Sequence, residues 1–283
     1  MAAKGLHIVT GATGSIGKEI ARALAARGCN IVLACRNTAR AEELRRELLA
    51  IDGCGEVIVA KVSLDSIDSI RDFAGHILAL DRPIAALLHN AGVMCRHRST
   101  TPDGFEQSLA VNYLAPVLLT KLLLPRVAQG GCIVFTTSIT RKLHRLSPEI
   151  LQEPASRFSQ LGTYGRSKLA LTHYALWLSE QLRDRGIRVN CADPGVVDTN
   201  MITMQRWYDP IATVLVRPLM SRPATGASSM LSALGSTLTG MIFKHTHKPH
   251  SIASDLRGSD AQRREGFMAA TETVIGESLL PER

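Results

Sequence analysis

The sequence predicts an α/β fold in which helices cover both faces of a doubly wound parallel sheet. Short apolar segments alternate with helical patterns along most of the 283 residues, which is typical of parallel strands joined by helices. A glycine-rich turn joins the first apolar segment to the first helical pattern, and small or polar residues end the later apolar segments. We find no internal repeat, low-complexity tract or linker, so we expect one domain over residues 1–283.

The first unit is a strand, a turn and a helix. Leu6–Thr10 is apolar, the turn runs from Gly11 through Gly14 to Gly17, and a helical pattern continues to near Gly28. In this order the glycines let the backbone approach a pyrophosphate, and the helix N-terminus faces its charge. A plain strand–helix turn is the alternative, and the context favours dinucleotide binding.

The end of the second strand indicates which dinucleotide fits. The strand Ile31–Cys35 runs into Arg36, and Arg40 follows about one helical turn later. An acidic residue here would accept hydrogen bonds from both ribose hydroxyls of NAD, whereas a guanidinium suits the 2′-phosphate of NADP. We therefore predict NADP(H) in preference to NAD(H). Thr38 is expected to cap a helix that extends to about Leu49.

The middle of the chain continues the alternation of strands and helices. Its apolar segments end in Asn90-Ala91-Gly92, in Ser138 and in Asp193-Pro194-Gly195. Ligands of such sheets bind at the carboxyl ends of the strands, where these residues join Gly11 and Arg36. The expected strands cover 56–60, 85–89, 132–136 and 188–192, and the expected helices cover 66–80 and 104–126.

The C-terminal part departs from this alternation. Residues 200–223 mix apolar and cationic side chains, including Trp207 and Tyr208, and we expect a helical lid over a pocket. A packed connector is the alternative. We expect the last helix of the chain to pack across the end of the sheet. The elements expected after the lid are a helix over 224–234, a last strand at 240–243 and a C-terminal helix over 259–276.

A tyrosine and a lysine are the candidate proton carriers. Tyr164 and Lys168 are four residues apart, so they share one face of a helix. A free tyrosine titrates near pH ~10, and a neighbouring ammonium favours the phenolate. We therefore expect Lys168 to lower the pKa of Tyr164 and make it a general acid and base. A surface helix with an unrelated tyrosine and lysine is the alternative, because the spacing alone is common.

Composition excludes some classes of partner. The net charge of +8 permits an anionic ligand, but the charges are scattered and aromatic residues make up only 4%, so we expect no nucleic acid. The six cysteines form no C-x-x-C pair and no histidine pair has metal-ligand spacing, so we expect reduced cysteines, no metal site and a cytoplasmic protein. Neither a signal peptide nor a run of about 20 apolar residues is visible, so we expect no transmembrane segment.

The motifs that carry a family resemblance are Thr10-Gly11-Ala12-Thr13-Gly14-Ser15-Ile16-Gly17, Asn90-Ala91-Gly92, Asn112, Ser138, Tyr164 with Lys168, and Pro194-Gly195 with Thr199. Together they resemble the short-chain dehydrogenase/reductase family, single-domain type, with a Rossmann-type sheet. The long interval between Ser138 and Tyr164 resembles the insertion of retinol-dehydrogenase-like and protochlorophyllide-reductase-like members. The resemblance implies an NADP(H)-dependent oxidoreductase that transfers a hydride between nicotinamide and the carbonyl or alcohol of a bulky apolar substrate, such as a steroid, retinoid or lipid.

The resemblance also implies roles for individual residues. Tyr164 would exchange a proton with the substrate oxygen, Lys168 would hold the nicotinamide ribose, and Ser138 would hydrogen-bond the substrate oxygen. Asn112 would kink its helix and hold a water that relays protons to Lys168. The implied cofactor contacts are Gly11, Thr13, Gly14, Ser15, Ile16, Gly17, Arg36, Asn37, Ser63, Leu64, Asn90, Ala91, Gly92, Tyr164, Lys168, Pro194, Gly195, Val197 and Thr199.

The sequence departs from the family pattern at several points, and the first of them keeps another branch of the family open. Gly14 before Ser15 gives a spacing typical of the extended branch, which includes enzymes acting on nucleotide sugars. Ser63 stands where an aspartate usually holds the adenine amino group, and His89 replaces an asparagine. A second alternative is a non-catalytic regulator that senses dinucleotides, although the chain keeps the tyrosine and lysine.

The resemblance also bears on assembly. Family members often pair through the helices that carry Asn112 and Tyr164, so a homodimer or homotetramer is plausible on this basis. The insertion before Tyr164 could obstruct that surface.

Overall fold

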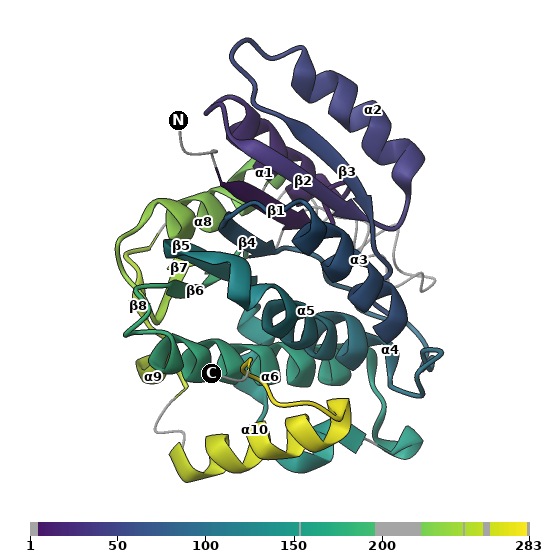
Figure 1. Cartoon of the computed structure of the whole chain (residues 1–283). Coiled ribbons are helices and arrows are strands. Elements are labelled where there is room, and N and C mark those ends of the chain that lie inside the picture. Colours follow the sequence, from purple (N-terminus) through teal and green to yellow (C-terminus); the bar gives the residue numbers. More distant parts are fainter. Residues whose placement is uncertain (1–4, 153, 196–221, 246, 257–260, 282–283) are drawn as a thin grey trace.

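The computed structural model describes residues 5–152, 154–195, 222–245, 247–256 and 261–281. Its strands are β1 Leu6–Thr10, β2 Asn30–Cys35, β3 Val57–Lys61, β4 Ile84–His89, β5 Val127–Thr136, β6 Arg188–Asp193, β7 Met241–Lys244 and β8 His250–Ser251. They form one sheet in the order β3-β2-β1-β4-β5-β6-β7-β8 (Figure 1). Neighbouring strands are parallel from β3 to β7, and β8 pairs antiparallel with β7. The doubly wound parallel sheet predicted from the sequence is confirmed.

Helices cover both faces of this sheet (Figure 1). One apolar core lies between the sheet and α1, α2 and α8, and a second lies between the sheet and α3, α5 and α6. The α-helices are α1 Ser15–Ala25, α2 Thr38–Leu49, α3 Ile67–Ala79, α4 Gln107–Leu109, α5 Ala115–Leu123, α6 Gln160–Gln181, α8 Pro223–Gly235, α9 Ile252–Asp255 and α10 Ala261–Ile275. The other helical segments are the π-helix η1 Ala110–Leu114 and the 3-10 helices η2 Leu124–Arg126, η3 Ile139–Leu143, η4 Pro148–Gln152 and η5 Ala155–Arg157.

The alternation of side chains along β2 shows why a strand between two cores is apolar throughout. Ile31 and Leu33 pack into the core under α1 and α2, whereas Val32 and Ala34 pack into the core under α3 and α5. All four are fully buried. A strand with both faces covered therefore reads as a continuous apolar run.

Several expected elements differ in detail from the structure. The cap of α2 is Asn37 rather than Thr38, because its Oδ1 accepts from the Arg40 N–H at 3.0 Å. The helix expected over 104–126 begins at Gln107 and is interrupted by η1. The strand at Met241–Lys244 is not the last one, because β8 follows it. The predicted lid lies outside the described residues up to residue 221, and α8 begins at Pro223.

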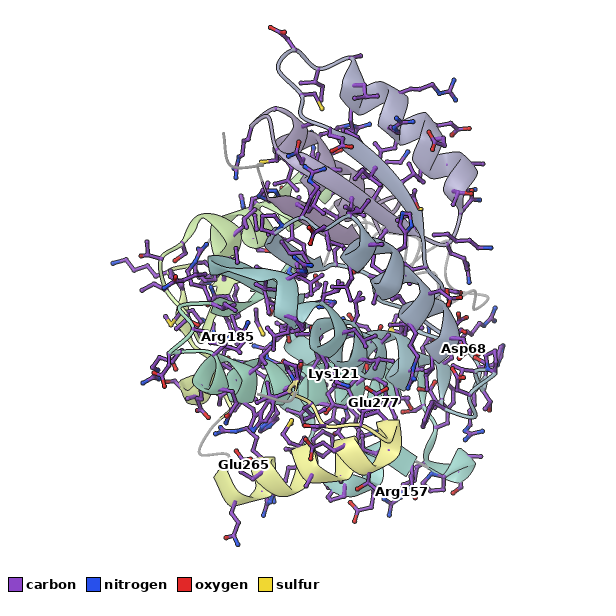
Figure 2. All side chains as sticks on the ribbon, in the orientation of Figure 1. Asp68, Lys121, Arg157, Arg185, Glu265 and Glu277 are labelled. Carbon is purple, nitrogen blue, oxygen red and sulfur yellow. The ribbon has the colours of Figure 1, made fainter. Side chains whose placement is uncertain are left out.

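The C-terminal helix α10 does not pack across the end of the sheet. It covers the outer side of the layer formed by α5 and α6 (Figure 1). Thr271 Oγ1 lies 2.7 Å from the phenol oxygen of Tyr113, and Trp177 Nε1 donates to Glu265 at 3.1 Å. Just after α10, Glu277 pairs with Lys121 of α5 (Figure 2). The apolar contacts of this helix are made with other helices, so it forms an extra layer outside the sheet and its helices.

Residues Gln107–Arg126 form one helical stretch in the described chain that is long and apolar enough to cross a membrane. It is not an unbroken run of apolar residues, because Gln107, Asn112, Lys121 and Arg126 lie within it. Its most apolar window has a mean hydropathy of 1.4, and 83% of that window is buried inside the protein. We therefore interpret the stretch as a core helix, because buried helices of globular proteins have the same composition.

Candidate active site

The carboxyl ends of β1 to β4 border an open groove of about 660 Å³. Residues that are far apart in the sequence meet here, as the parallel topology requires. Val62, Asp65, Val93, Gln107 and Val111 also line the groove and were not predicted. The predicted cofactor residues that line it are Gly11, Thr13, Gly14, Ser15, Ile16, Gly17, Arg36, Asn37, Ser63, Leu64, Asn90, Ala91 and Gly92.

The glycine turn after β1 fits a pyrophosphate. Gly11 has a φ of +64°, which glycine adopts without strain. A Cβ placed on Gly17 would lie 2.3 Å from the Gly11 carbonyl oxygen, so no larger residue fits there. No side chain caps α1, and its first turn contains no acidic residue, so the positive end of the helix is open to an anion in the groove.

The end of β2 supplies positive charge at the rim of the groove. Arg36 and Arg40 are exposed, and both line the groove. Asn37 caps α2 between them and fixes the direction in which the helix leaves the strand. Two guanidiniums at this position favour an anionic group at the rim of the groove.

A carboxylate that the sequence motif lacks is present two residues later. Ser63 Oγ donates to Asp65 Oδ1 at 2.5 Å, and Gln107 Nε2 donates to Asp65 Oδ2 at 3.1 Å. The hydrogen bond from Ser63 is the main cause that lowers the pKa of Asp65. The family motif places its aspartate at position 63, so the sequence comparison considered only that position and missed Asp65. An acidic residue two positions further on, still close to the end of the strand, was visible in the sequence.

Asn90 holds the end of β4 against the glycine turn. Its Nδ2 donates to the carbonyl oxygens of Thr10 at 3.0 Å and Gly11 at 3.3 Å. The N–H of Ala91 donates to Thr10 Oγ1 at 3.1 Å. These bonds fix two sides of the groove relative to each other.

Asn112 connects the loop after β4 to the helix that carries Tyr164. Its Oδ1 accepts from the Val93 N–H at 2.8 Å, and its Nδ2 donates to the Val93 carbonyl at 2.8 Å and to Ser167 Oγ at 3.0 Å. The helix around Asn112 has π geometry, because the Ala115 N–H bonds to the Ala110 carbonyl, five residues back, and the expected kink stays a prediction. The water that Asn112 was expected to hold stays a prediction.

Tyr164, Lys168 and Ser138 meet at the end of β5. Tyr164 and Lys168 lie one turn apart on α6, with Lys168 Nζ 5.8 Å from the centre of the tyrosine ring. Lys168 is 2% exposed, and its Nζ donates to the Thr136 carbonyl at 2.8 Å. Ser138 follows β5, and its hydroxyl is close enough to the Tyr164 phenol to affect the pKa of that group. A Cβ on Gly92 would lie 3.3 Å from Lys168 Nζ, so the groove and the catalytic side chains are contiguous.

The protonation states in this structure differ from the expectation. Burial raises the pKa of Tyr164 to about 12, the hydrogen bond with Ser138 opposes this rise, and the charge of Asp193 adds to it. Burial also lowers the pKa of Lys168 to about 8. The net pKa of Tyr164 is therefore raised and not lowered as expected, because loss of hydration destabilises the phenolate more than its surroundings stabilise it. Tyr164 carries its proton at neutral pH, which is the state a general acid needs.

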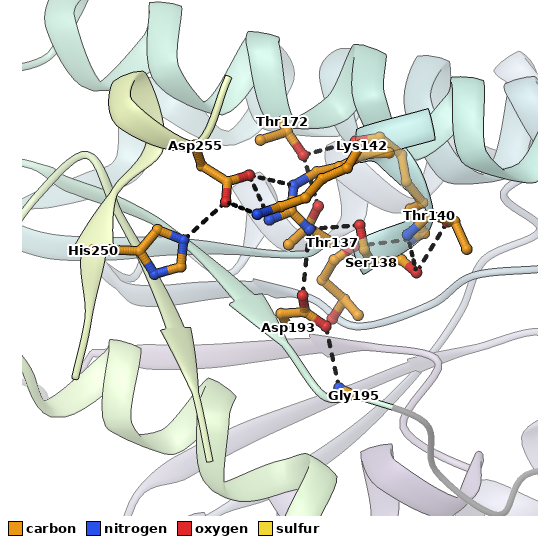
Figure 3. Close-up of polar contacts among 12 residues, drawn as sticks. Thr137, Ser138, Thr140, Lys142, Thr172, Asp193, Gly195, His250 and Asp255 are labelled. Atoms are coloured by element: carbon orange, nitrogen blue, oxygen red, sulfur yellow. Dashed lines mark hydrogen bonds and ion pairs between the residues drawn. The ribbon is translucent and has the colours of Figure 1, made fainter. Parts of the chain in front are cut away.

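The turn after β6 lies beside this set. The Gly195 N–H donates to Asp193 Oδ1 at 3.1 Å, and Figure 3 shows Asp193 close to Ser138. Pro194 lies between Asp193 and Gly195 at the carboxyl end of the strand, as predicted. Val197 and Thr199 lie outside the described residues.

Two histidines, His89 and His173, are buried in the core. His89 hydrogen-bonds Thr120 at 2.8 Å and stacks on Phe135, and burial lowers its pKa to about 3. Burial lowers the pKa of His173 to about 4, so both imidazoles are neutral core groups. All six cysteines are free. Within the described part of the chain, no group of three or more His, Cys, Asp or Glu side chains could hold a metal.

The sheet, the groove and the serine–tyrosine–lysine set define a class of protein: oxidoreductases that bind a nicotinamide dinucleotide and act on alcohols or carbonyls. Residues 6–208 match the family model described as short chain dehydrogenase, and the chain belongs to this family. It is therefore an NAD(P)-dependent dehydrogenase that acts on CH–OH groups. The predicted resemblance to retinol-dehydrogenase-like members is confirmed by the relatives described next.

Two curated proteins of Mus musculus are similar to this chain. Retinol dehydrogenase 11 is 35% identical over 245 residues, which cover 84% of this chain and 76% of that protein. Polyprenol dehydrogenase is 38% identical over 208 residues, which cover 71% of this chain and 62% of that protein. Among solved structures, an uncharacterized protein from Mycobacterium Paratuberculosis superposes with a TM-score of 0.77 at 26% identity, covering 99% of this chain and 96% of that one.

Proposed function

We propose that this protein is an NADPH-dependent reductase of bulky apolar ketones or aldehydes. The observation that carries the proposal is the position of Tyr164 beside Ser138 and Lys168, contiguous with a groove that has Arg36 and Arg40 at its rim. A protonated phenol is ready to give a proton to an oxygen that gains negative charge, and this occurs when a carbonyl is reduced.

NADPH, when bound, supplies the hydride to the carbonyl carbon. Tyr164 donates its phenol proton to the carbonyl oxygen, so that C=O, a hydride and a proton become CH–OH. Ser138 Oγ hydrogen-bonds that oxygen as charge develops on it. Lys168 provides a positive charge on the same helix face, which stabilises the phenolate that remains until Tyr164 regains a proton.

The apolar substrate class has two supports. Retinol and polyprenol, the substrates named for two similar proteins, are large apolar alcohols. In addition, large apolar side chains close in sequence to the catalytic residues are exposed: Ile139 and Leu143 follow Ser138, and Leu161 precedes Tyr164. Exposed apolar groups next to a reacting centre suit an apolar substrate.

A substrate panel tests the proposal. NADPH and NADH oxidation would be measured with steroid ketones, retinaldehydes and long-chain aldehydes, and also with nucleotide sugars. We expect turnover of at least one apolar carbonyl, with a lower KM for NADPH than for NADH. A lower KM for NADH would overturn the cofactor preference. Activity on nucleotide sugars alone would favour the extended branch, and NADPH binding without turnover of any compound would favour the dinucleotide-sensing regulator.

Assembly and compartment are part of the same proposal. Six free thiols fit a reducing compartment such as the cytoplasm. The outer side of α5 and α6, through which a homodimer or homotetramer was expected to form, is covered by α10 of the same chain. We propose that the chain does not pair through that side, and light scattering on the purified protein would measure its mass directly.

A further inference from the structure

Arg141 is a fully buried cation three residues after Ser138, and the site described above does not account for it. Its side chain is 0% exposed. Its Nε and Nη2 both donate to Asp255 Oδ2, at 3.0 and 2.6 Å. The other oxygen of Asp255 accepts from Lys142 at 2.7 Å and His250 at 3.0 Å (Figure 3). The short helix α9 is thereby tied to the segment that follows β5.

The opposite side of the guanidinium faces the catalytic residues. Arg141 Nη1 donates to the main-chain carbonyl of Ser138 at 2.5 Å and lies 3.3 Å from Asp193 Oδ2. Asp193 uses its other oxygen to accept from the Gly195 N–H at 3.1 Å. A single planar group thus holds the catalytic serine's backbone and the turn after β6 at a fixed separation.

A buried guanidinium between two buried carboxylates is stable only when its geometry is good, because each charge has lost its hydration. Asp193 and Asp255 are 4% and 2% exposed, so water cannot replace Arg141. Arginine suits the task because its N–H groups point in fixed directions, whereas an ammonium is a point charge.

We propose that Arg141 is a positioning residue for hydride transfer, with Asp255 of α9 as its anchor. Its guanidinium sets the position of Ser138 relative to the Asp193–Gly195 turn, so the C-terminal segment contributes to the geometry of the reacting centre. Productive transfer requires such groups within about 0.5 Å of their positions.

Arg141→Lys is the test, because it keeps the charge and loses the planar fork. We expect amide hydrogen exchange to accelerate in peptides spanning 136–142 and 190–195. We also expect the single-turnover rate per bound NADPH to fall about 30- to 100-fold. The Kd for NADPH should change by about threefold or less, because Arg141 does not line the groove.

Arg264→Lys is the matched control, because Arg264 is also mostly buried in an ion pair, with Glu180 at 2.6 Å. It should change neither the exchange of those two peptides nor the rate. If Arg141→Lys does not fold, Asp193→Asn replaces it, because this variant keeps the shape of the side chain and removes the charge that faces Arg141. Faster exchange in the two peptides and a slower single-turnover rate are again expected. Unchanged exchange in both peptides, or an unchanged rate per bound NADPH, would overturn the proposal.

The rate measurement rests on the proposed function, whereas the exchange measurement does not. If the wild-type protein oxidised NADPH with no carbonyl of the panel, the proposed function would fail. Hydrogen exchange would then still decide whether Arg141 holds the two segments together.

Discussion

Lys168 and Arg141 are both fully buried cations near Ser138, yet their surroundings differ. Arg141 lies between two carboxylates and also donates to a carbonyl. Lys168 donates to one carbonyl, and the described residues provide no carboxylate for it. The ammonium therefore holds its proton less firmly, and burial lowers its pKa to about 8. A buried cation that is paired with carboxylates stabilises the fold. A buried cation without a carboxylate partner, and with a shifted pKa, indicates a functional site.

The largest expected effect on stability comes from the Arg141 cluster. Asp255→Ala removes the main partner of Arg141 and leaves a buried guanidinium undercompensated, so the free energy of unfolding should fall by about 3–5 kcal/mol. Urea unfolding measures it. Glu180→Ala breaks the more exposed pair with Arg264 and should cost about 1 kcal/mol or less. If Asp255→Ala and Glu180→Ala lowered the free energy of unfolding equally, the account of Arg141 as a buried cation that depends on its carboxylate partners would be contradicted.

Lys168→Met should raise the free energy of unfolding, whereas Asp255→Ala lowers it. A pKa lowered to about 8 means that the folded protein disfavours the ammonium by about 3 kcal/mol at neutral pH. The Thr136 carbonyl loses its donor in the variant, which costs about 1 kcal/mol. We expect a net gain of about 2 kcal/mol in unfolding free energy and a turnover reduced at least about 100-fold. Exposed Lys61→Met is the control, and a destabilised Lys168→Met protein would contradict the prediction.

The pH dependence of that gain sharpens the comparison. Lys168 has a folded pKa of about 8, below its ordinary 10.5, so the penalty for burying the charge is complete below pH 8 and disappears as pH rises toward 10.5. The advantage of Lys168→Met should therefore shrink by about 2 kcal/mol between pH 7 and 10. Asp255 behaves oppositely: its pKa of about 2 gives stability above pH 3.8 that is lost as pH falls toward 2. Urea unfolding midpoints measured across this pH range would report both effects. A stability difference between Lys168→Met and the wild type that does not change with pH would contradict the lowered pKa of Lys168.

The smallest expected effect concerns an exposed cation. Arg36→Asp should raise the KM for NADPH about tenfold, equivalent to about 1.4 kcal/mol, by placing a carboxylate near the 2′-phosphate. The KM for NADH should fall, because a carboxylate at this position accepts hydrogen bonds from the ribose hydroxyls of NADH. The stability should stay nearly constant, because Arg36 is exposed. Arg46→Asp on the outside of α2 is the control. Equal changes for both cofactors would argue against phosphate recognition.

The sequence predicted the features that depend on local order along the chain. Gly11, Asn90 and Ser138 each follow an apolar strand, and parallel topology brings strand ends together, so their meeting could be inferred. The spacing of Tyr164 and Lys168 likewise fixed their shared helix face.

The features that were missed depend on how tightly side chains are packed or on contacts between segments that are far apart in the sequence. Arg141 and Asp255 meet only because α9 returns beside the segment that follows β5, and no local sequence pattern predicts this. The sign of the pKa shift at Tyr164 depends on how completely the phenol is buried, which spacing does not reveal. The position of α10 outside α6 depends on which of several apolar faces is left uncovered.

The most direct test of the account is single-turnover oxidation of bound NADPH by Tyr164→Phe with the best carbonyl from the panel. The variant should bind NADPH as tightly as the wild type and transfer hydride at least about 100-fold more slowly, a barrier increase of about 2.7 kcal/mol or more. Transfer at more than about one hundredth of the wild-type rate would contradict Tyr164 as the proton donor.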